Sequence, residues 1–254
     1  MARLVDSNEP SKPHTVIIIP AYNEAQVIAS VIAAIRENCD FPILVVDDAS
    51  TDNTARNAMQ AGATVVPLAA QLGAWGAMQT GLRLALRDGY EYAITMDADG
   101  QHSPDSLEDL LYPVVHGLAD VSIGACTERG SKMRKVAWAL MKYTSGLTLE
   151  DITSGFRVYN RRAILELTDR RATLLDYQDV GVLLLLQSRG LSIVDVDVVM
   201  QARQNGASRI FSSWLVVSFY MCQTLLLGLT KRKLARSFHH SRSNNQKPYS
   251  SETV

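Results

Sequence analysis

Residues 94–102 read ITMDADGQH, and their two acidic side chains are those best suited to chemistry with a metal ion. Asp97 and Asp99 stand one residue apart at the end of an apolar run. Two carboxylates this close repel each other, and burying unpaired charge is costly, so a positive group is expected between them. Carboxylate oxygens suit a hard cation such as Mg²⁺ or Mn²⁺, which leaves its other positions to water and phosphate oxygens. The stretch predicts a metal site of Asp97, Asp99 and Gln101 that would hold a diphosphate, with a solvated turn as the alternative.

Two further polar clusters follow apolar runs and are candidates for binding a nucleoside: Pro20-Ala21-Tyr22-Asn23-Glu24 and Asp47-Asp48. The carboxylates of Asp47 and Asp48 suit hydrogen bonds from a base and a ribose. The alternative is a structural cap for the helix that follows residues 50–52. Tyr22 and Glu24 suit stacking on and binding of the nucleoside, and the alternative is a loop tyrosine with an acid in a helix's first turn.

Charge is distributed unevenly along the chain, although the net formal charge is only −1. Residues 1–125 hold 6 basic and 16 acidic side chains, and residues 126–254 hold 19 basic and 10 acidic ones. The acidic half repels a nucleotide diphosphate unless a cation intervenes, and the basic half predicts contact with something anionic. The only glycine-rich candidate, LGAWG at 72–76, lacks the Gly-Lys-Ser/Thr ending of a phosphate loop. It is interpreted as a loop that approaches the sugar or phosphate closely through Gly73, or as a plain strand-to-helix turn.

These residues need a scaffold, and the first half of the chain alternates between short apolar runs and helical patterns. Strands are predicted at 15–20, 43–48, 63–68, 91–97 and 120–124. Helices are predicted after a capping box at Asn23-x-x-Gln26, at 54–62, at 76–89 and from Ser103-Pro104 onward. Such alternation forms right-handed βαβ units with a mostly parallel sheet. Ligands bind these sheets beyond the carboxyl ends of the strands, where the three polar clusters fall.

The second half is less regular. Residues 132–147 predict a basic amphipathic helix, 155–160 a strand, 177–190 a helix that ends at Gly190, and 192–199 a half-exposed strand. Residues 211–236 predict an apolar helix that runs into basic residues. Its apolar part would be about 24 Å long, short of a hydrocarbon core of about 30 Å. Attachment to the membrane surface is therefore favoured over a membrane span and over packing on the domain.

Composition narrows the class of protein. The 254 residues, 47% of them hydrophobic, are enough for one sizeable core. The three cysteines show neither a disulfide framework nor a zinc spacing, which fits a reducing cytoplasm. A phosphate-receiver domain is disfavoured because Asp47-Asp48 follow the second strand rather than the first. A nucleotidyltransferase is disfavoured because PAYNE is not a basic glycine-rich loop. The intact Asp97-x-Asp99 disfavours a binding module without turnover.

The motifs together resemble family 2 glycosyltransferases: PAYNE, VVDDAS-TDNT, the glycine loop before a helix, MDADGQHSP, DITSGFRVYNRRA and RQNGASR. The set is most similar to dolichyl- or polyprenyl-phosphate mannose or glucose synthases and covers about residues 14–210. The resemblance implies an α/β fold of the glycosyltransferase A type, a Rossmann-like sheet with helices on both faces. It also implies a nucleotide-sugar donor (UDP- or GDP-hexose), Mg²⁺ or Mn²⁺, and inversion of the anomeric carbon.

The resemblance also implies roles for individual residues. Pro20, Ala21, Tyr22, Glu24, Asp47, Asp48, Gly73, Asp97 and Ala98 would bind the nucleotide, Asp97, Asp99 and Gln101 the metal, and Arg157, Arg203, Ser208 and Arg209 would lie near the phosphates. Asp179 falls where relatives with a sugar acceptor place a catalytic acid. Two departures stand out: QLGAWG at 71–76 replaces the Asn-x-Gly-Lys-Gly of many relatives, and the extra transmembrane helices common among polyprenyl synthases are not evident.

The acceptor stays open between two classes. A polyprenyl (dolichyl or undecaprenyl) phosphate is already an anion, so no general base is required and Asp179 would orient the sugar. A glycan hydroxyl, as in lipopolysaccharide or exopolysaccharide synthesis, must lose a proton, and Asp179 would be the base. An ordinary first-turn acid is the alternative for Asp179. The basic second half, with Arg129 and Arg134 beside the amphipathic segment, favours the lipid phosphate.

The expected organisation has five segments: flexible residues 1–13 without the apolar core of a signal peptide, a nucleotide-sugar-binding half at 14–125, an acceptor-binding half at 126–210, a membrane-associating helix at 211–236 and a disordered tail at 237–254. The protein is expected in the cytoplasm, peripheral on the inner face of the plasma membrane. No nucleic-acid partner is expected, and a homo-oligomer is compatible with the sequence.

Overall fold

The computed structural model of the chain describes residues 14–126, 149, 154–170, 172–174 and 180–200. The described strands are β1 (Thr15–Ala21), β2 (Ile43–Asp47), β3 (Thr64–Pro67), β4 (Tyr92–Thr95), β5 (Val121–Ala125), β6 (Arg157–Asn160) and β7 (Ile193–Asp197). The described helices are α1 (Ile28–Asn38), α2 (Thr54–Gln60), α3 (Gly73–Arg87), α4 (Leu107–Val115), α6 (Arg161–Thr168) and α7 (Val180–Ser188), with short 3₁₀ turns η1 (Pro104–Ser106) and η3 (Ala172–Leu174).

The strands form one seven-stranded sheet in the order β3-β2-β1-β4-β6-β5-β7. Strands β3, β2, β1 and β4 pair in parallel, as expected for βαβ units. Strand β6 runs antiparallel to both of its neighbours, β4 and β5, and β7 is again parallel to β5. The predicted α/β class with a mostly parallel sheet is confirmed. The insertion of β6 between β4 and β5 was not predicted, because the pattern within a strand does not reveal which strand it pairs with.

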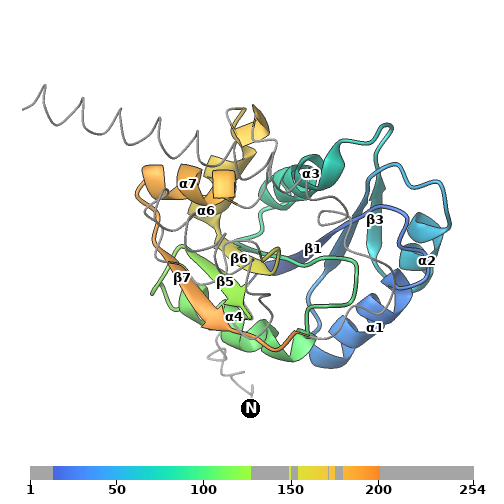
Figure 1. Ribbon diagram of the computed structural model, residues 1–254, viewed down its shortest axis with the longest axis horizontal. Helices are drawn as coiled ribbons and strands as arrows, with labels where there is room; N and C mark the ends of the chain where they lie inside the picture. Colours follow the sequence, from blue (N-terminus) through green and yellow to red (C-terminus); the bar gives the residue numbers. More distant parts are fainter. Residues whose placement is uncertain (1–13, 127–148, 150–153, 171, 175–179, 201–254) are drawn as a thin grey trace, which may run out of the picture. The chain divides into compact units, whose positions relative to one another are not determined.

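Helices cover both faces of the sheet, with α1, α2 and α4 on one and α3, α6 and α7 on the other (Figure 1). Side chains alternate along β1: Ile17 and Ile19 belong to the core that contains α1, whereas Ile18 faces α3. Helix α3 lies very close to the strand, since a Cβ added at Gly81 would be 2.4 Å from Ile18 Cγ2. Glycine at position 81 therefore permits the close approach of α3 to the sheet that carries the polar clusters.

Most of the predicted elements are confirmed, and their ends follow local chemistry. Gly62 (φ +91°) and Gly89 (φ +83°) follow α2 and α3 in the left-handed conformation that helix ends favour. Pro104 opens the turn that leads into α4, as predicted. The helical stripe of 28–35 is buried, as its spacing predicts.

The capping box predicted at Asn23-x-x-Gln26 is wrong. Helix α1 begins at Ile28 with no side-chain cap, and Asn23 lies outside it with φ +53°. The Asn23 side chain instead accepts a hydrogen bond from the Thr51 main-chain N–H at 2.8 Å. Local spacing identified the right residue types but not the partner, because the partner lies in another loop.

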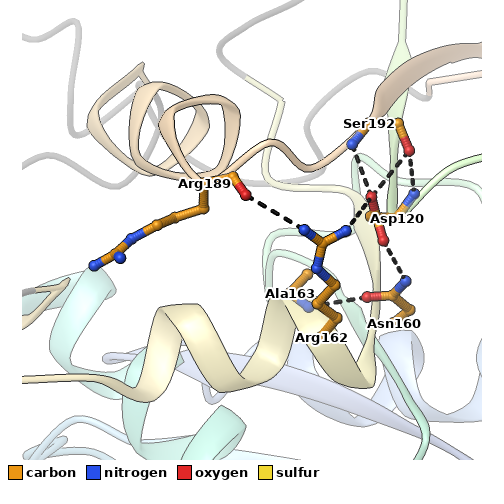
Figure 2. A network of polar contacts seen from close by, with 6 residues as sticks. All are labelled: Asp120, Asn160, Arg162, Ala163, Arg189 and Ser192. Carbon is orange, nitrogen blue, oxygen red and sulfur yellow. Dashed lines mark hydrogen bonds and ion pairs between the residues drawn. The ribbon is translucent and has the colours of Figure 1, made fainter.

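The edge of the sheet where β5 and β7 begin is fastened by a polar network around Asp120, shown in Figure 2. Its carboxylate accepts hydrogen bonds from the Ser192 N–H (2.8 Å), the Ser192 hydroxyl (3.0 Å) and Asn160 Nδ2 (2.9 Å). The Arg162 guanidinium lies 3.7 Å from Asp120 Oδ2 and donates a hydrogen bond to the Arg189 carbonyl. Partial burial opposes ionisation of the Asp120 carboxyl, but these donors outweigh burial and lower its pKa. The network joins β5, β6 and β7 at the edge opposite the polar clusters.

The predicted amphipathic helix at 132–147, the apolar helix at 211–236 and the tail at 237–254 lie outside the described residues, so these predictions stay untested. Within the part of the chain that the structure describes, none of the helices combines the length and apolar character that crossing a membrane requires.

Candidate active site

The three polar clusters predicted from the sequence meet along one edge of the sheet. Ala21, the last residue of β1, pairs with Asp47, the last residue of β2. On the other side of β1, Ile18 pairs with Thr95 at the end of β4, and the Met96 N–H donates to the Ile18 carbonyl at 3.1 Å. The Asp97 turn therefore emerges beside the loop that follows β1. The predicted gathering of these segments at the carboxyl edge is confirmed.

The turn after β4 leaves both of its acidic residues partly exposed, and a hydrogen bond within the turn holds its backbone. The Gln101 N–H donates to Asp99 Oδ1 at 3.1 Å, and Gly100 takes a left-handed φ of +73°. Ala98 between the two acids is buried, whereas 40% of the Asp97 side chain is exposed. The two acids are thus accessible and the residue between them anchors the turn.

Asp97 is bounded by His102, for which the sequence left a contact with the metal turn and a structural role open, and by Gly155, to which the sequence assigned no part. The Asp97 N–H donates to His102 Nδ1 at 3.1 Å, and His102 Nε2 lies 3.7 Å from Asp97 Oδ2. A Cβ added at Gly155 would be 2.7 and 2.9 Å from the two Asp97 carboxylate oxygens. The sequence placed His102 next to the metal turn, and the structure shows a buried side chain that supports the turn.

Gly155 is itself held in place by β4. The buried Thr95 hydroxyl donates to the Gly155 carbonyl at 2.8 Å, and Gly124 on β5 donates its N–H to the Phe156 carbonyl at 2.8 Å. A threonine hydroxyl at the end of an apolar run is the sequence signal for this contact, but only the pairing of β4 with β6 shows what it binds.

Arg157, predicted to lie near the phosphates, begins β6 and is buried. Its strand neighbours Phe156 and Val158 belong to the core that contains α1 and α4. Since side chains alternate along a strand, Arg157 faces the side of the sheet covered by α3 and α6. It lies next to Thr95 in the β4–β6 register, two residues from the glycine that abuts Asp97.

The loop after β1 is tied to the loop after β2. The Asn23 N–H donates to the Ser50 hydroxyl (2.9 Å), and the Glu24 N–H donates to the Thr54 hydroxyl (2.8 Å). Asp52 caps α2 through the Thr54 N–H and also accepts from the Ala25 N–H. Partial burial opposes ionisation of Asp52, but the hydrogen bond from the Thr54 hydroxyl and those from the Thr54 and Ala25 N–H groups outweigh it and lower the pKa of Asp52. Glu24 lies ahead of α1, so the first-turn position considered for it is wrong.

The two aspartates that end β2 have different surroundings, although both are buried. Asp48 accepts hydrogen bonds from the Leu72 N–H (2.7 Å) and the Gly73 N–H (2.9 Å), so it caps α3. The alternative interpretation of the sequence, in which Asp48 caps α2, is therefore wrong. Asp47 Oδ1 is buried and has no hydrogen-bond partner within the described part of the chain. Ala49 follows with a left-handed φ of +58°, which costs about 1 kcal/mol or more for a residue other than glycine.

The glycine loop at 72–76 is mostly the first turn of α3, which begins at Gly73 rather than at the predicted residue 76. Trp75 points away from solvent, and its Nε1–H donates to the Ala172 carbonyl at 2.8 Å. Four residues on, Gln79 Nε2 donates to the Leu167 carbonyl at 2.8 Å. These two side chains fasten α3 to α6 and η3, a tertiary role that the loop's composition did not indicate.

The donor set at the Asp97 turn fits a hard divalent cation. Among the described residues, no group of three or more His, Cys, Asp or Glu side chains surrounds one point. Mg²⁺ and Mn²⁺ do not need such a group, because one or two carboxylates suffice where water and substrate phosphates complete the coordination. Asp97 and Asp99, both partly exposed on a braced turn, supply those carboxylates.

Several predicted site residues lie outside the described part of the chain. They are Arg129, Arg134, Asp179, Arg203, Ser208 and Arg209, and their roles stay predictions.

Comparison with known proteins shows which family the chain resembles. Residues 16–168 match the family model described as glycosyl transferase family 2. Polyprenol monophosphomannose synthase of Mycolicibacterium smegmatis is 31% identical over 78% of this chain and 82% of its own length. Undecaprenyl-phosphate mannosyltransferase of Micrococcus luteus is 33% identical over 76% of this chain and 85% of its own length.

The fold is also found in a solved structure. Glucosyl-3-phosphoglycerate synthase from Mycobacterium tuberculosis, in complex with Mn²⁺, UDP and phosphoglyceric acid, matches with a TM-score of 0.66 at 20% identity. The match covers 86% of this chain and 78% of the other. At this identity the likeness shows a shared fold.

Proposed function

The chain belongs to glycosyltransferase family 2, and from this premise we propose that it transfers a hexose from a nucleotide sugar to a polyprenyl phosphate at a membrane surface. The observation that carries the proposal is the placement of the Asp97-Ala98-Asp99 turn at the carboxyl edge. Two relatives named for transfer to polyprenol or undecaprenyl phosphate match this chain over three quarters of its length.

In the proposed complex, the nucleoside lies over the ends of β1 and β2. The residues that bind it are Pro20, Ala21, Tyr22, Glu24, Asp47 and Asp48, with Gly73 at the rim. Asp47 Oδ1 supports this placement, because a buried carboxylate oxygen without a donor is costly and a nucleoside N–H or hydroxyl would supply one. At Gly73 an added Cβ would meet nothing within 4 Å, so a ligand has room beside it.

The diphosphate lies beside the turn after β4, where Asp97, Asp99 and Gln101 would hold Mg²⁺ or Mn²⁺. When bound, the cation offsets the negative charge that grows on the leaving diphosphate. The protein's contribution is to orient the two carboxylates through the Gln101 N–H and the contacts of His102 and Gly155. A solved structure of the same fold contains Mn²⁺ and UDP, which supports the choice of ligands.

The acceptor oxygen attacks the anomeric carbon opposite the leaving group, so the anomeric configuration inverts. A polyprenyl phosphate is ionised near neutral pH and needs no general base, and Asp179 would then orient the sugar. The basic residues of the second half, among them Arg129, Arg134, Arg203 and Arg209, would attract the anionic acceptor and the headgroups of a membrane on which the protein is peripheral.

The test is a donor and acceptor screen with the purified full chain. UDP- and GDP-hexoses are supplied with Mn²⁺ or Mg²⁺ and detergent-dispersed undecaprenyl phosphate. Labelled sugar should enter the organic phase as a phosphodiester of inverted anomeric configuration. Transfer only to a water-soluble glycan acceptor would replace the lipid assignment with the hydroxyl one.

A further inference from the structure

We propose that His102 is a positioning residue that, together with Gly155, sets the orientation of the Asp97 carboxylate toward a divalent cation. The inference rests on the proposed function and deepens it, because it assigns the support of the metal site rather than the site itself. The sequence shows His102 only as a neighbour of the turn. The structure shows it bound to the main chain of the residue whose side chain it also approaches.

The hydrogen bond from Asp97 fixes the state of the imidazole. His102 Nδ1 accepts the Asp97 N–H at 3.1 Å, so Nδ1 carries no proton. In the neutral ring the proton then resides on Nε2, which lies 3.7 Å from Asp97 Oδ2, an electrostatic contact that is longer than a hydrogen bond. One ring thus hydrogen-bonds the Asp97 backbone and approaches the Asp97 carboxylate.

The ring itself has little freedom to move. His102 is 6% exposed and stacks on Phe156 with ring centroids 5.0 Å apart and an interplanar angle of 14°. Its backbone forms an isolated antiparallel bridge with Met200. Phe156, which directly precedes β6, and Met200, which follows β7, therefore restrain His102, and His102 in turn restrains Asp97.

Gly155 also abuts the carboxylate. A side chain at this position would lie 2.7 Å from Asp97 Oδ1 and 2.9 Å from Oδ2, so only glycine leaves the carboxylate where it is. The Thr95 hydroxyl donates a hydrogen bond to the Gly155 carbonyl at 2.8 Å, so the Gly155 backbone cannot readily move away from the carboxylate. His102 and Gly155 together bound the carboxylate, while 40% of its side chain stays exposed to a ligand.

Such support matters because outer residues that orient metal-binding groups typically change metal affinity by about 10- to 100-fold when they are replaced. His102→Leu removes both contacts to Asp97 and keeps an apolar group against Phe156. His102→Asn keeps an acceptor near the position of Nδ1 but removes the Nε2–H. Gly155→Ala leaves the histidine intact and displaces the carboxylate, which has solvent to turn into.

The experiment measures Mn²⁺ affinity of the full chain by electron paramagnetic resonance, with and without UDP, alongside thermal unfolding. His102→Leu and Gly155→Ala should each weaken Mn²⁺ binding about tenfold or more, and His102→Asn should recover part of the loss. The matched control His116→Gln, at an exposed histidine stacked on Tyr112, should bind Mn²⁺ like the wild type.

Two outcomes would overturn the inference in distinguishable ways. Unchanged Mn²⁺ affinity in both His102→Leu and Gly155→Ala, with tight binding by the wild type, would reject the positioning role alone. Absence of Mn²⁺ binding by the wild type, with or without UDP, would reject the proposed metal-dependent function as well. Because Gly155→Ala does not alter the buried ring, it keeps the test decisive if His102→Leu fails to fold.

Discussion

Replacing Asp48 with alanine should destabilise the fold and weaken nucleotide binding together. Asp48 is 3% exposed, and its carboxylate accepts two main-chain hydrogen bonds at the start of α3, from the Leu72 and Gly73 N–H groups at 2.7 and 2.9 Å. It also lies at the positive end of the α3 dipole. Alanine would leave the Leu72 and Gly73 N–H groups without their acceptor and detach the β2 loop from α3.

The size of the effect follows from the number and kind of bonds. Net contributions of hydrogen bonds to charged groups are about 1.5–3 kcal/mol each. Leu72 and Gly73 are exposed overall, so water can replace part of what is lost. We therefore take the lower value for each bond and expect a loss of about 3 kcal/mol in the free energy of unfolding. For a chain of this size that loss lowers Tm by roughly 6–12 °C.

The assay is urea unfolding followed by circular dichroism, paired with calorimetric titration of UDP. Asp52→Ala is the matched control, because the Asp52 carboxylate also accepts two main-chain hydrogen bonds, from Thr54 and Ala25, but Asp52 is exposed, so water replaces most of the loss and the cost should be about 1 kcal/mol. If Asp48→Ala unfolds within 0.5 kcal/mol of the wild type, the cap does not fasten α3 as the hydrogen bonds indicate.

Three further changes test the scaffold. Gly81→Ala should lower the free energy of unfolding by about 2 kcal/mol in urea titrations, since its Cβ would lie 2.4 Å from Ile18 Cγ2; no loss would mean that α3 shifts freely. Trp75→Phe should cost about 1–2 kcal/mol by removing the Nε1–H bond to the Ala172 carbonyl, and equal stability would show water replacing it. The lowered pKa of Asp120 stabilises the fold fully above about pH 4 and progressively less as pH falls through the folded pKa. Asp120→Asn should therefore show a flatter loss of stability below pH 4, and an unchanged acid profile would refute this origin.

Sequence patterns predicted most of the sheet because burial imposes them locally. The β-branched runs that became β1 and β2 and the helical stripe of α1 could be recognised without any neighbour. The position of the candidate site could be predicted from topology, because parallel strands bring their carboxyl ends to the same edge of the sheet. The Asp97 turn was identified because two adjacent carboxylates at the end of a buried strand repel each other unless a cation lies between them.

Contacts between segments far apart in the chain could not be predicted in this way. Asn23 has the residue type of a helix cap, but its side chain accepts from the Thr51 N–H in the next loop. As an alternative to binding a ligand, Asp48 was expected to cap the helix that follows it, α2, but its carboxylate caps α3. The hydrogen-bond partners of Asn23 and Asp48 depend on which loops lie next to each other, and the strand order determines which loops do.

The same limit explains why the support of Asp97 was missed. Gly155 lies 58 positions after Asp97 in the chain, and only the antiparallel pairing of β4 with β6 brings it against the carboxylate. The departure at 71–76 has a comparable explanation, because Trp75 docks α3 onto the chain at Ala172. Trp75, which replaces a residue of the usual Asn-x-Gly-Lys-Gly motif, therefore makes a tertiary contact with Ala172 that the motif does not predict.

Metal-dependent transfer at the Asp97 turn is tested most directly by counting labelled hexose in the organic phase after incubation with undecaprenyl phosphate. The wild type with Mn²⁺ should accumulate label, excess EDTA should stop accumulation, and Asp99→Ala should stay inactive while unfolding at the wild-type temperature. Undiminished transfer by Asp99→Ala, or by the wild type in excess EDTA, would contradict the assignment.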